Sequence, residues 1–341
     1  MATKSRMLEQ EEHIMKPETE VLASFAKFLA SLTVGTVTTV GNLMVYPVFT
    51  ADPQANGYLL LEEAVQSGKF TITEVEAGGS VPNLQVTNGL NRDVLLLDGD
   101  ILVGAKQNRS CTTTILIGKK TAPVIDVNCV ERGRWAARGA HFSGGRTHLH
   151  SRLRARKSRS VTDSLKRSRG YVADQGEVWH EISMKAASFS THDARFQRSP
   201  TEAADEIYTQ YESRITEYAA AVPPGEGQVG FLVLIAGTLV GGDIFGNPAV
   251  LAKTYGKSLR SYLLDAVEQS LANEKPADVT KDAKRKAVAF LRSLRTGTHA
   301  PFAATGTGTN IRVDGKTVHG FAVMHADQVV HLAAFREAGP A

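Results

Sequence analysis

The chain has 341 residues, of which 42% are hydrophobic and 22% charged, with a formal net charge of +4. These proportions are typical of a globular protein of one large or two modest domains. The two cysteines, Cys111 and Cys129, lie in apolar runs without zinc-site spacing, so we expect buried thiols. The longest apolar run, residues 230–242, is well short of the roughly 20 residues that span a bilayer. Residues 1–19 contain no apolar signal region. Composition thus excludes a transmembrane helix and a disulfide scaffold, and we expect a cytoplasmic protein with no membrane partner.

The first half of the chain is predicted to be β-rich. Residues 1–19 are predicted to be a disordered tail, and apolar residues at helical spacing then predict a helix over 20–32. Runs of β-branched and aromatic residues, separated by turn residues, predict strands at 36–40, 43–46, 70–75, 84–87, 94–97, 111–117 and 124–130, with a short helix at 59–66. This spacing is typical of an antiparallel sandwich or barrel, which we assign to a subdomain over 20–135.

In the second half the period of the apolar residues lengthens to between three and four. Helices are predicted at 174–187, 258–271 and 280–294, and Ser199-Pro-Thr-Glu202 predicts a capped start for a helix that continues to residue 218. Strands are predicted as a hairpin over 229–244 and at 311–313, 318–325 and 328–335. We therefore expect an α+β fold, with a helical α+β subdomain over 171–336 following the β-rich half.

Between the two halves lies a strongly basic stretch. Residues 132–169 contain twelve Lys or Arg and one acid, Asp163, so the stretch carries +11 and the remainder −7. Such a split creates a positive field that concentrates phosphates and other anions. The alternative is that the Arg/Ser-rich part, within 136–170, is a solvated and disordered insertion, because it has few apolar residues.

The richest chemistry follows a predicted buried strand, in residues 95–109. Asp98 and Asp100 lie in the turn after the strand, and four polar residues come next: Lys106, Gln107, Asn108 and Arg109. Alternate side chains of an extended segment share a face, which pairs Gln107 with Arg109 and Lys106 with Asn108. Either pair could bind an anion or the edge of a nucleobase. The alternative is a polar hairpin tip without a ligand.

A second cluster, Glu131-Arg-Gly-Arg-Trp135, ends the strand predicted at 124–130. Arg132 and Arg134 suit phosphate or carboxylate, and Trp135 offers a stacking face. The alternative is that Trp135 anchors the core while the arginines pair with surface acids. Glu177 lies in the first turn of the next predicted helix, where carboxylates also complement the helix dipole.

Two histidines resemble half of a metal site. His148 and His150 share one side of an extended segment, but no neighbouring acid completes the site and the surrounding arginines would repel a cation. We therefore expect no metal bound by this pair.

Taken in order, four segments are similar to those of a known family: 104–109, 131–135, 174–179 and the hairpin over 230–245. On these segments the chain resembles the ARG and rhodanese-phosphatase-superfamily-associated protein domain family over about residues 40–336. The name of that family records an association with ADP-ribosylglycohydrolases. The resemblance therefore implies, by association, work on ADP-ribose or a related nucleotide, and it supplies no catalytic residue.

The leading hypothesis is a protein that binds a phosphorylated nucleotide of the ADP-ribose or NAD type and hydrolyses or transfers part of it. Phosphate would be neutralised by Lys106, Arg109, Arg132 and Arg134, polar edges would bind Gln107 and Asn108, and Trp135 would stack. General acid-base work or Mg²⁺ binding would fall to Asp98, Asp100, Glu131 and Glu177. One alternative is a nucleic-acid-binding module that uses residues 132–169. Another is a scaffold whose basic segment orders on an acidic protein partner.

Overall fold

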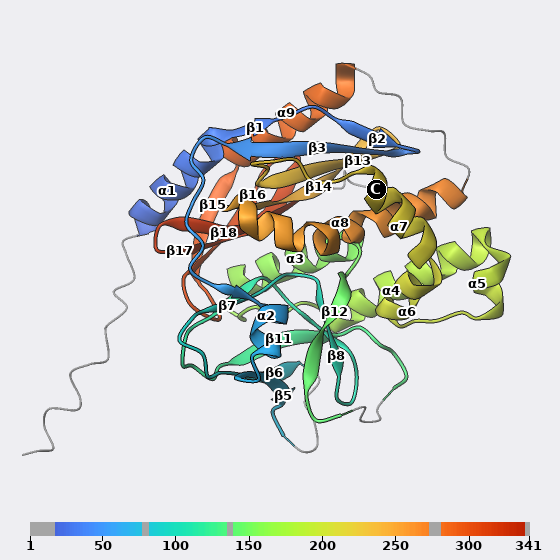
Figure 1. Ribbon diagram of the computed structural model, residues 1–341, viewed down its shortest axis with the longest axis horizontal. Helices are drawn as coiled ribbons and strands as arrows, with labels where there is room; N and C mark the ends of the chain where they lie inside the picture. Colours follow the sequence, from blue (N-terminus) through green and yellow to red (C-terminus); the bar gives the residue numbers. More distant parts are fainter. Residues whose placement is uncertain (1–17, 77–81, 135–138, 273–280, 338–341) are drawn as a thin grey trace, which may run out of the picture.

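The largest element of the structure is a nine-stranded antiparallel sheet, at the top of Figure 1. The computed structural model describes residues 18–76, 82–134, 139–272 and 281–337. In the sheet the strands follow the order β1-β3-β13-β14-β18-β17-β16-β15, and β2 pairs with β3. Their bounds are β1 Leu32–Val34, β2 Thr38–Val40, β3 Leu43–Thr50, β13 Gly230–Ile235, β14 Thr238–Phe245, β15 Thr298–Ala303, β16 Thr309–Asp314, β17 Val318–His325 and β18 Gln328–Arg336. The first strands of the chain therefore lie beside strands from its last third.

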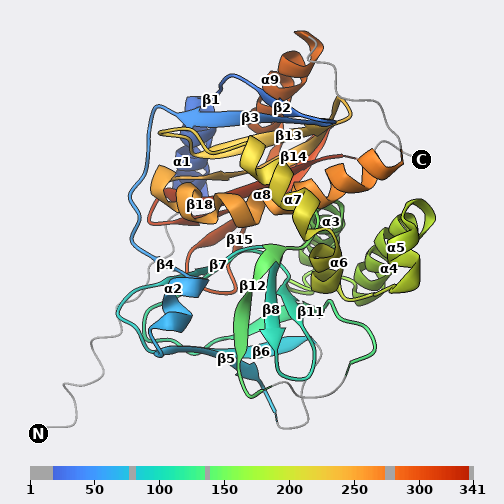
Figure 2. The same cartoon turned by 45° about the vertical axis from the view of Figure 1, so that its right-hand side comes forward.

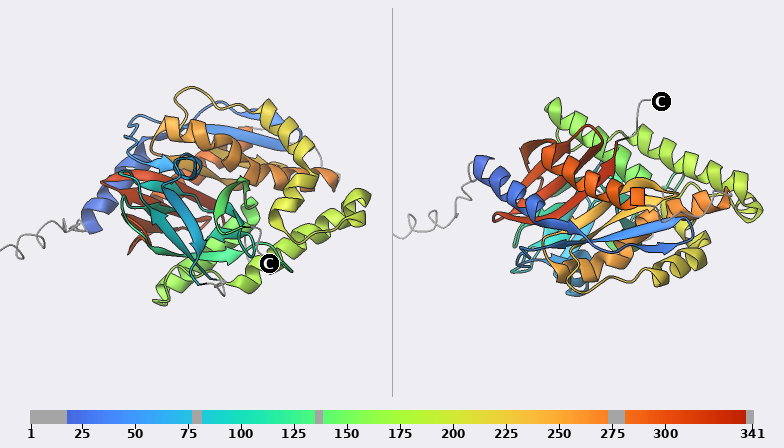
Figure 3. Two further views of the ribbon diagram at one scale, coloured as in Figure 1. Left: turned by 60° about the horizontal axis from the view of Figure 1, so that its bottom comes forward. Right: turned by 90° about the horizontal axis from the view of Figure 1, so that it is seen from above.

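Helices cover both faces of this sheet. Along β13 the side chains alternate, so that Phe231 and Val233 face one core and Leu232 faces the other. The helices α1 (Glu18–Ser31) and α9 (Lys281–Thr296) pack on the side of Leu232, and the right-hand view of Figure 3 shows them across the outer face of the sheet. The opposite face packs against α8 (Pro248–Leu271) and α3 (Ser151–Lys166).

A smaller β unit lies on the other side of α3 and α8, at the bottom of Figures 1 and 2. It contains a six-stranded sheet in the order β12-β8-β9-β11-β6-β5 and a three-stranded sheet in the order β10-β7-β4. The bounds are β4 Leu59–Leu60, β5 Phe70–Glu74, β6 Asn83–Asn88, β7 Val94–Leu96, β8 Asp100–Gly104, β9 Arg109–Cys111, β10 Ile115–Ile117, β11 Val124–Cys129 and β12 Phe142–His148. Its strands and the short helix α2 (Leu61–Gln66) enclose a core of their own.

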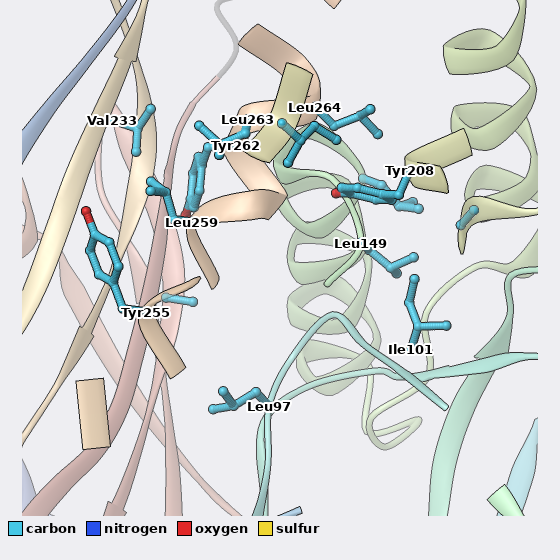
Figure 4. Packing of buried hydrophobic residues seen from close by; sticks show 14 of the residues in the cluster. Leu97, Ile101, Leu149, Tyr208, Val233, Tyr255, Leu259, Tyr262, Leu263 and Leu264 are labelled. Carbon is cyan, nitrogen blue, oxygen red and sulfur yellow. The ribbon is translucent and has the colours of Figure 1, made fainter. Parts of the chain in front are cut away.

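A helical layer separates the two β units. Besides α3 and α8 it contains α4 Gln175–His192, α5 Ala194–Arg198, α6 Ala204–Gln210 and α7 Glu212–Ala221. Leu149, just before α3, is fully buried in the core that joins this layer to both units. Figure 4 shows it among Ile101 of the small unit, Tyr208 of α6 and Leu264 of α8.

One buried arginine ties the three layers together. Arg154 of α3 donates from Nε to Asp98 of the small unit at 2.9 Å, and from Nη1 and Nη2 to Asp243 of the large sheet at 3.1 and 2.6 Å. Lys157 also pairs with Asp98, at 2.9 Å. Burial alone would raise the pKa of Asp98, but Lys157 and Arg154 outweigh burial and the pKa is lowered. The two buried cations of α3 are therefore neutralised by one carboxylate from each β unit.

The predicted α+β class is confirmed, with strands dominating the first half and helices the second. Two local predictions are wrong, and one alternative is excluded. The strand predicted at 111–117 is two strands in different sheets, β9 and β10. The helix predicted to continue to 218 is interrupted at Tyr211, and α6 begins at Ala204 without a side-chain cap. Residues 142–148 and 151–166 are ordered as β12 and α3, so a disordered insertion is not what they form.

The predicted boundaries do not follow the sheets. Strands β1 to β3 fall in the predicted 20–135 subdomain, yet β3 pairs with β13 of the 171–336 part. Two strands so far apart in the sequence leave no local pattern that shows their pairing. The predicted boundary at residue 135 followed local patterns only and therefore divides the strands of one sheet. Of the predicted 1–19 tail, residues 1–17 lie outside the described residues, and Glu18 and Thr19 open α1. Within the described ranges, the longer helices all fall short of the length and apolarity that a membrane span requires.

Candidate functional site

A cavity of about 580 Å³, here called the α3–α4 cavity, opens where α3, α4 and α8 meet two hairpin ends of the large sheet. Five cations line it: Arg152, Arg156, Arg159, Lys185 and Arg336. The three from α3 are spaced three or four residues apart and so share one helix face. The two other cations in this part of α3, Arg154 and Lys157, face the core and are fully buried. The basic helix thus divides its charge between an internal network and an open cavity.

A buried carboxylate of α4 holds two of these arginines in place. Glu181, whose side chain is 2% exposed, accepts Nε of Arg152 at 2.8 Å and Nε of Arg156 at 2.7 Å. The two arginine side chains are themselves 48% and 56% exposed. Both contacts are made through Nε, and about half of each arginine side chain stays accessible to a ligand. Two parallel guanidinium forks are suited to the oxygens of a phosphate.

The floor of the cavity is a buried ion cluster. Lys185 bonds both Asp265 and Glu268 of α8, and Ser151 Oγ also bonds Asp265. His150 Nδ1 lies 3.5 Å from Asp265. Burial alone would raise the pKa of Asp265, but Lys185 and then His150 outweigh burial and lower it. Burial lowers the pKa of His150, which therefore stays neutral near pH 7.

The remaining walls differ in character. An apolar wall comes from the β13–β14 hairpin through Ile235, Leu239 and Val240. Glu177, one of the predicted catalytic residues, also lines the cavity, one helical turn before Glu181. Asp174 caps this helix by accepting the backbone N–H groups of Gly176 and Glu177. A cationic side, an apolar side and the exposed carboxylate of Glu177 therefore face a common space.

The structure brings five of the predicted site residues together elsewhere, at the ends of β9 and β11. Arg134 donates from Nε and Nη2 to the two carboxylate oxygens of Glu131, both at 2.6 Å. Asn108 N donates to Glu131 Oε2 at 2.9 Å, and Gln107 Nε2 donates to the Glu131 carbonyl at 3.1 Å. Arg109 Nη1 donates to Gln107 Oε1 at 3.1 Å, which is the same-face contact expected for that pair. These polar groups bond one another inside the protein and line neither of the cavities described here.

The backbone at this cluster is constrained by a glycine. Gly104 has φ +145°, and a Cβ there would lie 2.4 Å from the carbonyl oxygen of His141. The next residue, Ala105, also has a positive φ of 38°, and its carbonyl accepts Arg134 Nη1 at 2.8 Å. Such backbone strain persists only where the surroundings fix it, and here the arginine helps to do so.

The other predicted residues are dispersed. Asp98 belongs to the Arg154 network, and Asp100 lines a second cavity. Arg132 pairs with Glu202 at 3.3 Å, with its guanidinium 5.7 Å from the ring centre of Trp179. Lys106 is half-buried. Trp135 lies outside the described residues.

The side chains of His148 and His150 do not meet at a common site in the structure. Among the described residues, no group of three or more His, Cys, Asp or Glu side chains is arranged to hold a metal ion. His148 and His150 instead contact different carboxylates, Asp100 and Asp265. Both cysteines are free and buried, as expected.

The sequence reasoning missed the residues that organise the α3–α4 cavity. Neither Glu181 nor Lys185 was singled out as a site residue from the sequence, yet each residue is 1% exposed and bonded to charged partners at this cavity. A usable signal existed: Glu177, Glu181 and Lys185 recur every four residues on one helix, just after a helix with arginines at matching spacing.

A comparison with protein-family models matches residues 31–335 to the model described as ARG and Rhodanese-Phosphatase-superfamily-associated Protein domain. A search of curated proteins and of solved structures gives no match.

Proposed function

The chain belongs to the ARG and Rhodanese-Phosphatase-superfamily-associated Protein domain family, and from that premise we propose that it binds a phosphorylated nucleotide of the ADP-ribose or NAD type and hydrolyses or transfers part of it. In this proposal the ligand lies in the α3–α4 cavity. The association that the family name records supports the ligand class, and the chemistry of the cavity supports the location.

One observation carries the proposal: Glu181 is buried and holds the Nε atoms of Arg152 and Arg156 side by side at the cavity wall. Orienting the forks before binding reduces the entropy lost when phosphate is bound. Arg336 lines the same space, as does Arg159, which also pairs with Asp314 and Glu337, and these two arginines could bind a second phosphate. A diphosphate linkage, as in ADP-ribose, therefore suits this side of the cavity.

The other walls fit the rest of such a ligand. The apolar wall of Ile235, Leu239 and Val240 could cover a base or the face of a sugar. Glu177 is a carboxylate at the same cavity, and carboxylates commonly accept hydrogen bonds from ribose hydroxyls. In our proposal Glu177 binds such a hydroxyl and acts as the general base, which keeps one of the four predicted carboxylates in its predicted role.

Isothermal titration calorimetry with ADP-ribose tests the proposal. In the double variant Arg152→Gln/Arg156→Gln the Kd should rise about 100-fold or more, since each lost charge-assisted contact is worth about 1.5–3 kcal/mol. The variant also removes both cations from the buried Glu181 carboxylate, so its fold is checked by circular dichroism before the Kd is compared. The matched control, Arg167→Gln/Arg169→Gln, removes the same charge from exposed positions outside the cavity and should leave the Kd within about threefold.

The control also separates the nucleic-acid alternative. A protein that tracks a phosphate backbone with residues 132–169 should lose nucleic-acid affinity in both double variants, with a steep dependence on salt. Within the described residues, most cations of that stretch already pair with acids of this chain, including Arg134, Arg154 and Lys166. This pairing weakens the field that the alternative needs. ADP-ribose binding that is unchanged in Arg152→Gln/Arg156→Gln would contradict our proposal.

A further inference from the structure

A second cavity, here called the α2–α8 cavity, has a volume of about 560 Å³ and lies between the small β unit and the N-terminal half of α8. The buried charged residues at its floor are arranged like those at the floor of the α3–α4 cavity. Asp100 bonds Lys257, as Asp265 bonds Lys185. His148 Nε2 lies 3.1 Å from Asp100, where His150 lies beside Asp265. In this cavity, then, a buried carboxylate contacts one lysine and one imidazole.

In both cavities the floor lysine also bonds a second acid. Lys257 also bonds Glu62 at 2.7 Å, as Lys185 also bonds Glu268. The two histidines that serve the two floors are separated only by Leu149, whose side chain is fixed in the central core. His148 is the last residue of β12, whereas His150 is the N-cap of α3. The two imidazoles therefore belong to different elements and contact different carboxylates.

The walls of the α2–α8 cavity hold further cations and an apolar surface. Arg146 and Lys253 line it together with Lys257. The apolar part consists of four leucines: Leu60, Leu61, Leu95 and Leu97. Gly144 and Gly145 form part of one wall and leave room there for the neighbouring groups. A Cβ on Gly144 would come 3.0 Å from Glu62 Oε1, and a Cβ on Gly145 would come 2.8 Å from the Ile101 carbonyl oxygen.

The charged residues of the α2–α8 cavity indicate which ligands it can bind. Three cations face three acids, but only Asp100 is fixed: its side chain is 3% exposed, whereas those of Glu62 and Glu63 are 46% and 36% exposed. Lys253 pairs with Glu63 at 2.5 Å. When an anion enters, Lys253 and Lys257 can exchange these two partly exposed glutamates for the ligand at a modest cost, since exposed ion pairs are worth about 0–1 kcal/mol. Glu63 keeps its contact with the Leu60 backbone N–H at 2.9 Å, and Asp100 is the one buried acid among the three cations of the described lining.

We propose that the α2–α8 cavity is a second ligand site, which binds the phosphate group of a small phosphate monoester. A monoester dianion carries about −1.5 to −2 charges at pH 7 and can pair with several of these cations at once. Arg146 and Lys253 bind its oxygens from the rim, Lys257 binds from the floor, and the leucines cover an apolar ester group. This site is independent of the α3–α4 cavity and of the reaction proposed for it.

Calorimetry of the full chain with phenyl phosphate and, separately, inorganic phosphate tests this assignment. The measurements use the Arg152→Gln/Arg156→Gln background, in which the first cavity is impaired. We expect saturable phenyl phosphate binding that weakens about tenfold or more when Arg146→Gln/Lys253→Gln is added. The control pair Lys119→Gln/Arg167→Gln removes equal charge from exposed residues that line neither cavity.

The two ligands and the pH separate the outcomes. Tighter binding of phenyl phosphate than of inorganic phosphate supports an ester seated on the leucines, whereas equal affinities would overturn the ester part of the assignment. Binding should weaken from pH 7 to pH 5 as the phosphate takes up its second proton, with pKa about 6. Unchanged affinity in Arg146→Gln/Lys253→Gln, or an equal loss in the control pair, would overturn the site. Neither result depends on whether ADP-ribose binds the first cavity.

Discussion

At Glu181, one buried carboxylate orients two half-exposed arginines. A glutamate that is 1% exposed normally needs cationic partners at close range, and Glu181 obtains both of them from α3. The cost of burying this charge is therefore offset by the same contacts that aim the guanidinium forks at the cavity. In this arrangement Glu181 is a positioning residue, because it touches the arginines and not the ligand.

The variant Glu181→Gln should separate positioning from stability. The free energy of unfolding should fall by only about 1–2 kcal/mol, because the half-exposed arginines can rehydrate. The Kd for ADP-ribose should rise about tenfold, while the weaker binding of adenosine, which has no phosphate, stays unchanged. Equal losses for both ligands in calorimetry would show that Glu181 only supports the fold. The variant Glu202→Gln, which removes an acid from an exposed pair with Arg132, serves as the control.

At the scale of elements, α3 shows where sequence patterns are silent. The periodicity of α1 and the hairpin of β13 and β14 predicted their structures, since local apolar spacing encodes which face is buried. The sequence of α3 is dominated by Arg, Lys and Ser, and nothing local shows that Arg154 and Lys157 are buried. Their partners, Asp98 and Asp243, come from distant segments. The floor of the α3–α4 cavity depends on the same kind of distant pairing, between Lys185 and Asp265, and only the four-residue spacing of Glu177, Glu181 and Lys185 gave a local signal for this site.

The predicted cluster around Arg109 illustrates the converse case. The motifs at 104–109 and 131–135 were expected to converge, and their polar residues do lie within hydrogen-bond distance of one another. Sequence alone does not reveal whether such residues enclose a space or fill it. Here Glu131, Asn108 and Arg134 bond each other, and the open cations lie on α3 instead.

Two glycines give a matched test of how the large sheet is packed. A Cβ on Gly242 of β14 would lie 2.0 Å from the carbonyl oxygen of Phe231, a backbone atom that cannot move aside. A Cβ on Gly256 of α8 would meet nothing within 4 Å. Gly242→Ala should therefore lower the free energy of unfolding by about 3 kcal/mol or more. Gly256→Ala should raise it by about 0.5–1 kcal/mol, because alanine is the better helix former. Urea denaturation of both variants measures the difference, and similar values for the two would contradict the described packing.

At the scale of the whole molecule, buried titratable groups join the layers and should make stability depend on pH. Burial lowers the pKa of His148 and of His150, so both are neutral in the fold, whereas unfolded histidines titrate near pH 6.5. Below that pH the unfolded chain binds more protons, and stability should fall by up to about 1.4 kcal/mol per pH unit for each histidine.

A second fall should follow at lower pH. The pKa of Asp98 and that of Asp243 are lowered in the fold, because the paired cations outweigh burial. The stability that these carboxylates contribute is present above about pH 4 and is lost as the pH drops below their unfolded values. Urea denaturation at pH 8, 7, 6, 5, 4, 3 and 2 checks both windows. A free energy of unfolding that stays constant from pH 7 to pH 5 would contradict the buried, neutral state of the histidines.

The two cavities and the Arg154 network share the same elements. α8 contributes Lys253 and Lys257 to one cavity and Asp265 and Glu268 to the other. Between these positions Ser261 Oγ accepts a hydrogen bond from Nη1 of Arg154 at 3.3 Å, which joins α8 to the central network. A single helix thus positions charged groups at both sites, and its placement between the two β units determines where the cavities open.

The most direct test of the central claim is the crystal structure of the full chain with ADP-ribose. We predict phosphate oxygens within hydrogen-bond distance of the terminal amino groups of Arg152 and Arg156, with Glu181 still bonded to both Nε atoms. ADP-ribose bound at the Gln107–Arg134 cluster, or anywhere outside the α3–α4 cavity, would contradict the account.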